Sequence, residues 1–202
     1  MALAVFPTKG NLINIKRSLM LAKLGFDLMD RKRNILVREM MSLIDTAKSI
    51  RGEIETIFDH AYKALQTANI TLGVCDSIAK GIEVETGLEI EYRSVMGVEI
   101  PKVTLNSKFD TGAYGFSGTN SQFDIAYICF DRAKRISVVL AEVENSVYRL
   151  ANEIKKTQRR ANALKNVNIP QFERTIKYIS DALEEKEREE FGRLKVIKKT
   201  KI

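Results

Sequence analysis

The chain has 202 residues, of which 29% are charged, and its formal net charge is +7. Its apolar residues fall in short runs, which excludes a membrane-spanning helix, and residues 1–8 lack the charged-then-apolar order of a secretory signal. Two cysteines are too few for a disulfide scaffold, so a cytoplasmic protein with reduced, packed thiols is expected.

The first predicted element is a long helix over about residues 8–73, with a cap near Thr8 or Asn11. Positions spaced alternately three and four apart are apolar in sixteen of seventeen cases, and Arg33 is the exception. They are Leu12, Ile15, Leu19, Ala22, Phe26, Met29, Arg33, Leu36, Met40, Leu43, Ala47, Ile50, Ile54, Ile57, Ala61, Ala64 and Ala68. A mean spacing of about 3.5 residues keeps one stripe facing a partner, which predicts a coiled coil and a rod-like molecule.

Residues 74–121 form a predicted connector that contains a β-hairpin at about 82–103. Leu88, Ile90 and Tyr92 alternate with charged residues, which is typical of a half-exposed strand. The alternation resumes after a turn near 95–97, and Pro101 is expected to limit the second strand. The Gly-, Ser- and Thr-rich stretch 110–122 is predicted to be a mobile loop.

A second long helix is predicted from about Gln122 to about Lys195. Its stripe is Ala126, Cys129, Ala133, Ile136, Leu140, Val143, Val147, Leu150, Ile154, Thr157, Ala161 and Leu164, with Thr157 the polar exception. Leu164, Asn168 and Phe172 are then spaced four and four, which predicts a stutter that locally unwinds a coiled coil. Pro170 lies inside this stutter and is expected to bend the helix or remove a backbone hydrogen bond.

Two stripes of nearly equal length, joined by a short connector, predict antiparallel pairing. Partner residue numbers would then sum to about 195, which places Arg33 opposite the region of Asn162. The predicted fold class is all-α dominated: a long antiparallel two-helix coiled coil with a short β-hairpin in the connector. The predicted domains are an N-terminal shaft helix (1–73), the connector (74–121), and a C-terminal shaft helix with a basic tail (122–202).

The charge is uneven along the chain. Residues 1–40 carry eight Lys and Arg against three Asp and Glu, residues 148–202 carry fifteen against eight, and residues 41–147 carry ten against fifteen. Antiparallel pairing would bring both basic segments to one end, where they would favour an acidic partner or nucleic acid. A solvated flank of a soluble coiled coil is the simpler explanation of the clusters. A nucleic-acid interface is disfavoured, because no exposed aromatic or nucleic-acid-reading module accompanies them and acidic residues are interspersed.

No catalytic residue, cofactor site or metal site is predicted. His60 lies on a charged helix flank, and Cys75 and Cys129 fit packing positions better than a redox pair. The glycine-rich stretch 112–118 lacks the Lys-Ser/Thr that a phosphate-binding loop requires.

Three segments resemble the D subunit of the V-type and archaeal-type ATPases. They are PTKGNL at 7–12 with LMLAKLGFDLMDRKR at 19–33, SVMGVEIP at 94–101, and the stretch from Glu153 to Lys198 that begins EIKKTQRRANALKNVNIPQFERTIKYIS. The resemblance implies a non-catalytic rotor axle that couples ATP hydrolysis or synthesis to ion transport. It also implies three partners: the catalytic and regulatory head subunits, a small companion stalk subunit of the F type, and a funnel-shaped subunit on the membrane ring. The implied location is peripheral, on the cytoplasmic side of a membrane.

Candidate contacts follow from this resemblance. The head contacts would be Arg31, Lys32, Lys156, Arg159, Arg160 and Lys165, and the hairpin contacts would be Val95, Met96, Gly97 and Val98. Arg33 is expected to lie partly in the stripe. Two alternatives remain open from the residues alone, a non-enzymatic coiled-coil scaffold and a nucleic-acid-binding rod. Whether protons or sodium ions are moved, and in which direction the complex works, is left open.

Overall fold

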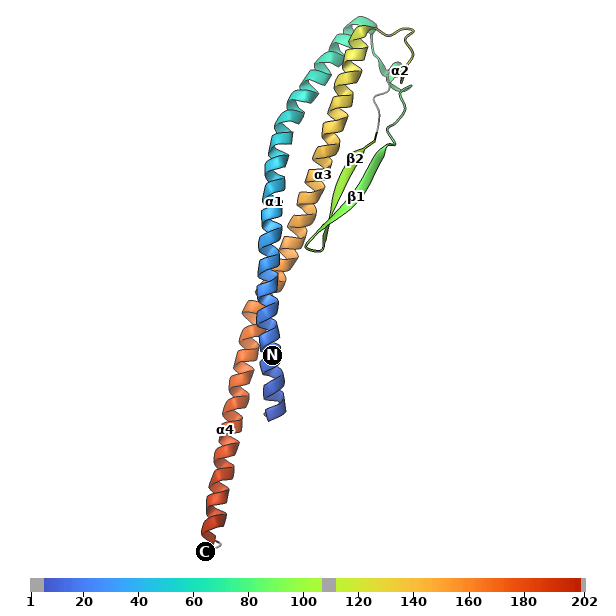
Figure 1. Cartoon of the computed structure of the whole chain (residues 1–202). Helices are drawn as coiled ribbons and strands as arrows, with labels where there is room; N and C mark the ends of the chain where they lie inside the picture. The colour runs from blue at the N-terminus through green and yellow to red at the C-terminus, as the bar shows by residue number, and fades with distance from the viewer. Residues whose placement is uncertain (1–5, 107–111, 201–202) are drawn as a thin grey trace. The chain divides into compact units, whose positions relative to one another are not determined.

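The computed structural model describes residues 6–106 and 112–200 (Figure 1). In chain order its elements are α1 (Lys9–Leu72), α2 (Asp76–Ala79), β1 (Leu88–Val95), β2 (Val98–Leu105), α3 (Ser121–Ala163), the π-helical turn η1 (Leu164–Asn168) and α4 (Ile169–Thr200). Two compact units share these elements: unit 1 comprises Met1–Asn34 and Ile154–Ile202, and unit 2 comprises Ile35–Glu153. The predicted domains follow the chain order, whereas unit 1 combines segments from both ends of the chain.

Helix α1 begins and ends at residues suited to these positions. The Thr8 hydroxyl accepts a hydrogen bond from the Asn11 backbone N–H at 3.2 Å, so Thr8 is the N-cap. At the other end Gly73 has φ +79°, a left-handed conformation that glycine adopts without steric cost. Its N–H bonds the Asn69 carbonyl and closes the last turn, as the predicted helix end near residue 73 requires.

The predicted stripes are the buried faces of the helices. Residues less than one-tenth exposed at stripe positions are Ala22, Leu36, Ile50, Ala61 and Ala68 on α1, Ala126, Ala133, Val143, Leu150, Thr157 and Ala161 on α3, and Ile179 on α4. Small side chains are frequent in this set, which lets two helix backbones approach closely. Burial of these side chains is the main favourable contribution to pairing.

Ion pairs between the helices show that the pairing is antiparallel. In unit 1, Lys9 pairs with Glu187 and Lys23 pairs with Glu173, at 3.0 and 2.9 Å. In unit 2, Arg51 pairs with Glu144 at 3.0 Å. The residue numbers in each pair sum to about 195, so the predicted register is confirmed.

The hairpin has a continuous antiparallel register from Leu88↔Leu105 to Val95↔Val98. Its two-residue turn consists of Met96 and Gly97, with φ of 51° and 78°, and this mirror-image turn suits the right-handed twist of paired strands. The sequence placed the turn correctly, but the expectation for Pro101 was wrong, because β2 continues past it to Leu105. The N–H that proline lacks would point away from β1, so the ladder loses no hydrogen bond there.

Side chains of α3 cover the outer edge of β2. The Val103 N–H donates to Glu142 Oε2 at 2.8 Å, the Ser146 hydroxyl lies 3.5 Å from the Pro101 carbonyl, and the Arg149 guanidinium donates to the Glu99 carbonyl at 3.2 Å. Figure 1 shows β2 on the side of α3 and β1 on the outside of unit 2. The hairpin is therefore fixed by α3 residues about one turn apart on a single helix face.

The second long helix departs from α-helical geometry where the stutter is predicted. It becomes π-helical over Leu164–Asn168, because an insertion that shifts the stripe must be absorbed by local unwinding. Pro170 follows in α4, where it has no N–H to donate. Part of the loop predicted at 110–122 lies outside the described residues, and α3 already begins at Ser121, where the Asn120 side chain caps it by accepting from the Phe123 N–H.

Candidate partner-binding surface

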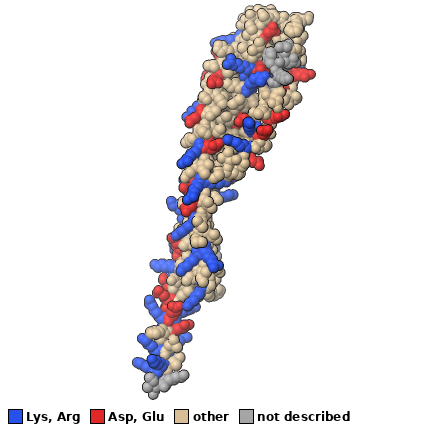
Figure 2. All heavy atoms as spheres, in the orientation of Figure 1, with Lys and Arg blue, Asp and Glu red and all other residues tan. Residues whose placement is uncertain are grey.

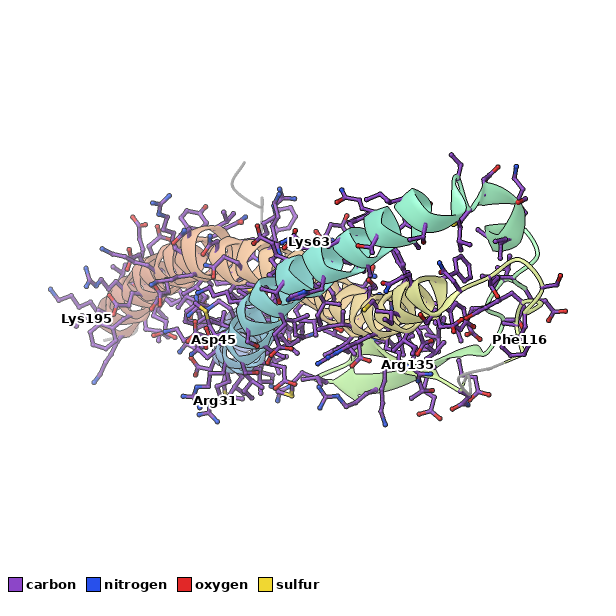
Figure 3. All side chains as sticks on the ribbon, turned by 90° about the horizontal axis from the view of Figure 1, so that it is seen from above. Arg31, Asp45, Lys63, Phe116, Arg135 and Lys195 are labelled. Carbon is purple, nitrogen blue, oxygen red and sulfur yellow. The ribbon has the colours of Figure 1, made fainter. Side chains whose placement is uncertain are left out.

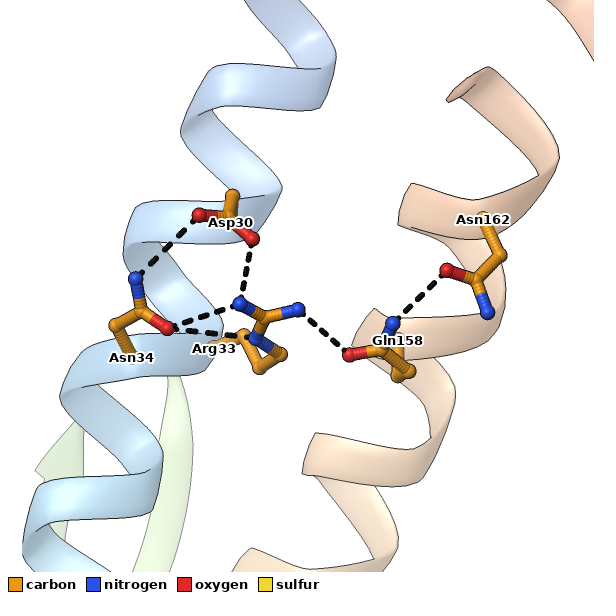
Figure 4. Close-up of polar contacts among 5 residues, drawn as sticks. All are labelled: Asp30, Arg33, Asn34, Gln158 and Asn162. Carbon is orange, nitrogen blue, oxygen red and sulfur yellow. Dashed lines mark hydrogen bonds and ion pairs between the residues drawn. The ribbon is translucent and has the colours of Figure 1, made fainter. Parts of the chain in front are cut away.

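A polar layer interrupts the apolar stripe of unit 1 (Figure 4). Arg33 Nη1 donates to Gln158 Oε1 at 2.9 Å, and Arg33 Nη2 pairs with Asp30 Oδ1 at 2.7 Å. Asn34 Oδ1 accepts from the same guanidinium, while Gln158 Nε2 donates to Asn162 Oδ1 at 2.8 Å. Arg33 thus lies in the region of Asn162, as predicted, and its charge is satisfied within the layer.

The polar layer brings the predicted head contacts to one level of unit 1. Arg31 and Lys32 directly precede Arg33 on α1, while Lys156, Arg159 and Arg160 surround Gln158 on α3. These five residues and Lys165 therefore belong to one region, here called the basic patch: Arg31, Lys32, Lys156, Arg159, Arg160 and Lys165. The Arg33–Gln158 hydrogen bond connects its two halves.

Members of the basic patch differ in how far they are engaged. Arg31, Lys156, Arg159 and Arg160 are exposed, and they form no ion pair with any residue that the structure describes. Figure 3 shows Arg31 projecting away from α1. Lys165 lies with its Nζ 5.7 Å from the centre of the Phe26 ring, close enough for a cation–π interaction. Four of the six cations are thus available to carboxylates of a partner.

Sequence reasoning missed a second stripe on α1, here called the outer stripe: Ile13, Met20, Leu24 and Leu28. All four are more than half exposed, at 52, 60, 52 and 64%. Their spacing of seven, four and four places them on one face of the helix, with Arg17 between the first two and Arg31 one turn after the last. The same spacing rule could have found this stripe, but the apolar seam beside it accounts for the helix on its own.

The hairpin tip offers fewer accessible atoms than its sequence indicated. Val98 is 8% exposed and Val95 is half-buried, whereas Met96 is 44% exposed and Gly97 is exposed. The tip is held to α1 by an ion pair between Arg93 and Glu39 at 2.8 Å. Of the four predicted contacts, Met96 and Gly97 are therefore the exposed ones.

An ionic cluster anchors the segment before β1 to α3. Lys134 pairs with Glu85 at 2.9 Å and with Asp131 at 3.0 Å, and Asp131 also accepts from Arg135 at 2.8 Å. Burial alone would raise the pKa of Asp131, but hydrogen bonds from Arg135 and Lys134 outweigh it and lower that pKa. Burial likewise opposes the charge of Lys134, while Glu85 and Asp131 raise its pKa. These charges pair with one another inside unit 2.

An aromatic cluster closes the end of unit 2 where α1 and α3 are joined by the connector. Buried Ala68, Cys75 and Phe123 form its core, and the Tyr114 ring meets Phe123 edge-on at 4.8 Å. Burial and a hydrogen bond to Asp124 raise the pKa of Tyr114 to about 12.

The remaining residues that the sequence singled out for possible chemistry lie in ordinary surroundings. Cys75 packs in the aromatic cluster as predicted, whereas exposed His60 and half-buried Cys129 line a shallow groove between the helices. Within the described residues no cluster of His, Cys, Asp and Glu could hold a metal ion.

Comparison with known proteins identifies the family. The model of the family described as the D subunit of ATP synthase matches residues 11–199. The chain is 45% identical over 199 residues to the D subunit of the V-type ATP synthase of Thermotoga neapolitana, covering 97% of this chain and 98% of the relative. It is 37% identical to the A-type D subunit of Pyrococcus horikoshii and 39% identical to that of Thermococcus kodakarensis, in each case over 97% of this chain and 94% of the relative.

The chain belongs to the family of ATP synthase D subunits.

The D subunit is the central stalk of the V-type and A-type rotary ATPases and is not a catalytic subunit of the complex. Other subunits of the ATP synthase are its partners, and the scaffold and nucleic-acid alternatives are not supported. In the part of the chain that the structure describes, no helix is long and apolar enough to cross a membrane.

Proposed function

We propose that unit 1 is the part of the rotor axle that binds the catalytic head. The observation that carries the proposal is the basic patch, in which Arg31, Lys156, Arg159 and Arg160 are exposed and form no ion pair with described residues. Cations left unpaired on a protein surface are available to complementary carboxylates, which steer association and fix the orientation of a partner. The outer stripe adds apolar contact area beside them.

Uneven contact explains how such a surface couples chemistry to rotation. An axle that bound three catalytic interfaces equally could not make them differ, because a ligand shifts an equilibrium only through unequal affinity. The basic patch and the outer stripe make the surface of unit 1 asymmetric. Each orientation of the axle then favours one interface, and ATP hydrolysis moves the favoured orientation stepwise.

The remaining partners are assigned by resemblance to the family. We place a small companion stalk subunit of the F type and a funnel-shaped subunit along the rest of the axle, on the cytoplasmic side of a membrane. The tip residues Val95, Met96, Gly97 and Val98 are proposed to modulate hydrolysis or to engage a stalk neighbour. Exposure favours Met96 and Gly97 as the residues in contact.

A charge-reversal variant tests the head contact. The quadruple variant R31E/K156E/R159E/R160E, reassembled with the catalytic and regulatory head subunits, should lose at least about tenfold in ATP-driven rotation, because like charges facing carboxylates cost several kcal/mol. Its helicity should remain native. The control R38E/K102E/R132E reverses three exposed cations of unit 2 that form no ion pair with a described residue, and it should leave rotation close to wild type. Equal rotation in both variants would contradict the proposal.

Removal of the hairpin tests its proposed role. Replacing residues 88–105 by a short Gly-Ser linker should keep the helix pair, whose register is set by the stripes, and change the ATPase rate of the reassembled complex. An unchanged rate in a variant of native helicity would refute the regulatory role. The head-contact proposal would be unaffected by that result.

A further inference from the structure

The two edges of the hairpin differ in how far the rest of the molecule covers them. The outer edge of β2 is covered by Glu142, Ser146 and Arg149 of α3. In β1, seven of eight residues are exposed, whereas the first four of β2 include three that are buried. An edge strand of eight residues is longer than the usual length of about five to six, and uncovered edges are the places where a further strand can pair.

The register shows which backbone groups of β1 point outward. In an antiparallel ladder hydrogen-bonded pairs alternate with non-bonded pairs. The Asn106 N–H bonds the Gly87 carbonyl, and the Val103 N–H points to α3, so Ile90↔Val103 is a non-bonded pair. The N–H and C=O groups of Leu88, Ile90, Tyr92 and Ser94 therefore face away from β2. None of these four residues has a backbone hydrogen bond at this edge to any residue that the structure describes.

The side chains of β1 specify what could pair there. Leu88, Ile90 and Tyr92 lie on one face of the strand, and are 45, 53 and 58% exposed. Glu89 and Glu91 lie on the other face, and neither forms an ion pair with a described residue. An added strand would extend the apolar face with apolar residues and place basic residues beside the two carboxylates, because opposite charges on adjacent strands stabilise a sheet.

We propose that the free edge of β1 accepts an extended segment of a partner protein in which apolar and basic residues alternate. This mode of recognition, strand addition, obtains affinity from main-chain hydrogen bonds and specificity from alternate side chains. A second copy of this chain fits poorly, because antiparallel pairing of two β1 strands would oppose their glutamates. The proposal rests on the proposed function in one respect, since the donor is sought among the subunits of the reassembled rotary complex.

Residue-resolved amide hydrogen exchange on the full chain tests the proposal. The probe is an octapeptide of alternating valine and lysine, and the control is the same peptide N-methylated at every amide, so that neither of its edges can pair. The probe should slow exchange at Leu88, Ile90 and Tyr92 at least about tenfold, and the control peptide should not. Glu89, Glu91 and Arg93 serve as an internal reference, because their N–H groups already bond β2.

A pair of variants separates the backbone from the side chain. Ile90→Pro removes an outward N–H that the hairpin does not use and should abolish the response to the probe, while Ile90→Ala should retain most of it. Protected amides at Glu91 and Arg93 verify that the hairpin is intact in Ile90→Pro. If the amides of Glu91 and Arg93 are not protected in Ile90→Pro, that variant is set aside. The comparison of the probe with the N-methylated peptide on the wild-type chain then distinguishes strand pairing from nonspecific binding.

The same three amides should become protected in the reassembled rotary complex. Unchanged exchange at Leu88, Ile90 and Tyr92 both with the probe and in the complex would overturn the inference. Failure of the chain to copurify with the head would instead contradict the proposed function, and the probe experiment would still decide whether β1 accepts a strand.

Discussion

Units 1 and 2 each contain part of helix α1, but the other elements that pack against α1 differ between the two units. In unit 2 the helix pair is supplemented by a hairpin, an aromatic cluster and an ionic cluster, so that Glu39, Glu142 and Asp131 are all engaged internally. In unit 1 the helices have only each other, their seam includes a polar layer, and four cations of the basic patch remain unpaired among described residues. Lys and Arg are interspersed with Asp and Glu on the face drawn in Figure 2. The comparison shows that these three carboxylates of unit 2 are engaged within it, whereas the four exposed cations of the basic patch in unit 1 have no ion-pair partner among the described residues.

The largest expected effect is the loss of a fully buried seam residue in unit 2. Leu150 has no exposed surface, so Leu150→Ala should lower the free energy of unfolding by about 2–5 kcal/mol through lost burial and a residual cavity. Chemical denaturation of the full chain measures this. The matched control is Leu24→Ala in the outer stripe, where the side chain is 52% exposed and a change within about 0.5 kcal/mol is expected. A large cost at Leu24 would mean that the outer stripe is a packing surface within the chain.

Substitutions in the polar layer of unit 1 should not lower the free energy of unfolding as Leu150→Ala does. The double variant Arg33→Leu/Gln158→Leu replaces the two central polar side chains of the layer by apolar ones, while Asp30 is 36% exposed and stays hydrated. Stability should be unchanged or rise by about 1–3 kcal/mol. Polar residues in a coiled-coil seam restrict register, so alignment should become less uniform. Spin-label distances between positions 20 and 175 should therefore broaden, since Lys23 and Glu173 are paired in the native register. A narrow, unchanged distribution would show that the apolar stripe alone sets the alignment.

The ionic cluster makes the stability of unit 2 depend on pH. The folded-state pKa of Asp131 is lowered, so its contribution is present above its ordinary pKa of about 3.9 and is lost as pH falls through the folded value. Asp131→Asn should cost about 1–2 kcal/mol at neutral pH and flatten the loss of stability in acid.

Lys134 gives the matching test in alkali. Its folded-state pKa is raised, so its contribution is complete below its ordinary pKa of about 10.4 and is lost as pH rises through the folded value. Denaturation curves measured at a series of pH values check both predictions, the loss of stability in acid and the loss in alkali. If the free energy of unfolding of the wild type falls in acid no more steeply than that of Asp131→Asn, the Asp131 carboxylate contributes nothing to stability.

The smallest expected effect concerns two glycines. Gly97 has φ +78° in the hairpin turn, so Gly97→Ala should destabilise by about 1 kcal/mol, because a side chain is strained in that conformation. Gly52 lies in the interior of α1 with open space around it, so Gly52→Ala should stabilise by about 0.5–1 kcal/mol. Thermal unfolding of the two variants should shift in opposite directions.

Most of the fold could be predicted because one rule, the three-and-four spacing, determines both helix formation and the buried face. That rule identified Thr157 and Arg33 as exceptions, and they prove to be a buried polar residue and the centre of the polar layer. The expectation for Pro101 was wrong because it did not take account of the register, which places Pro101 opposite Tyr92 in a non-bonded pair where no N–H is needed. The same rule could have found the outer stripe, but it could not show that the stripe is exposed, since exposure depends on contacts with other parts of the chain.

The sequence by itself determined the antiparallel helix pair, its register near a sum of 195, the position of the hairpin turn and the site of the stutter. These depend on local spacing and on residues such as Gly97 whose conformational range is intrinsic. Only the tertiary structure decided which cations remain unpaired, which hairpin edge is covered and which is open. Those features depend on contacts between residues far apart in the chain, and periodicity carries no information about them.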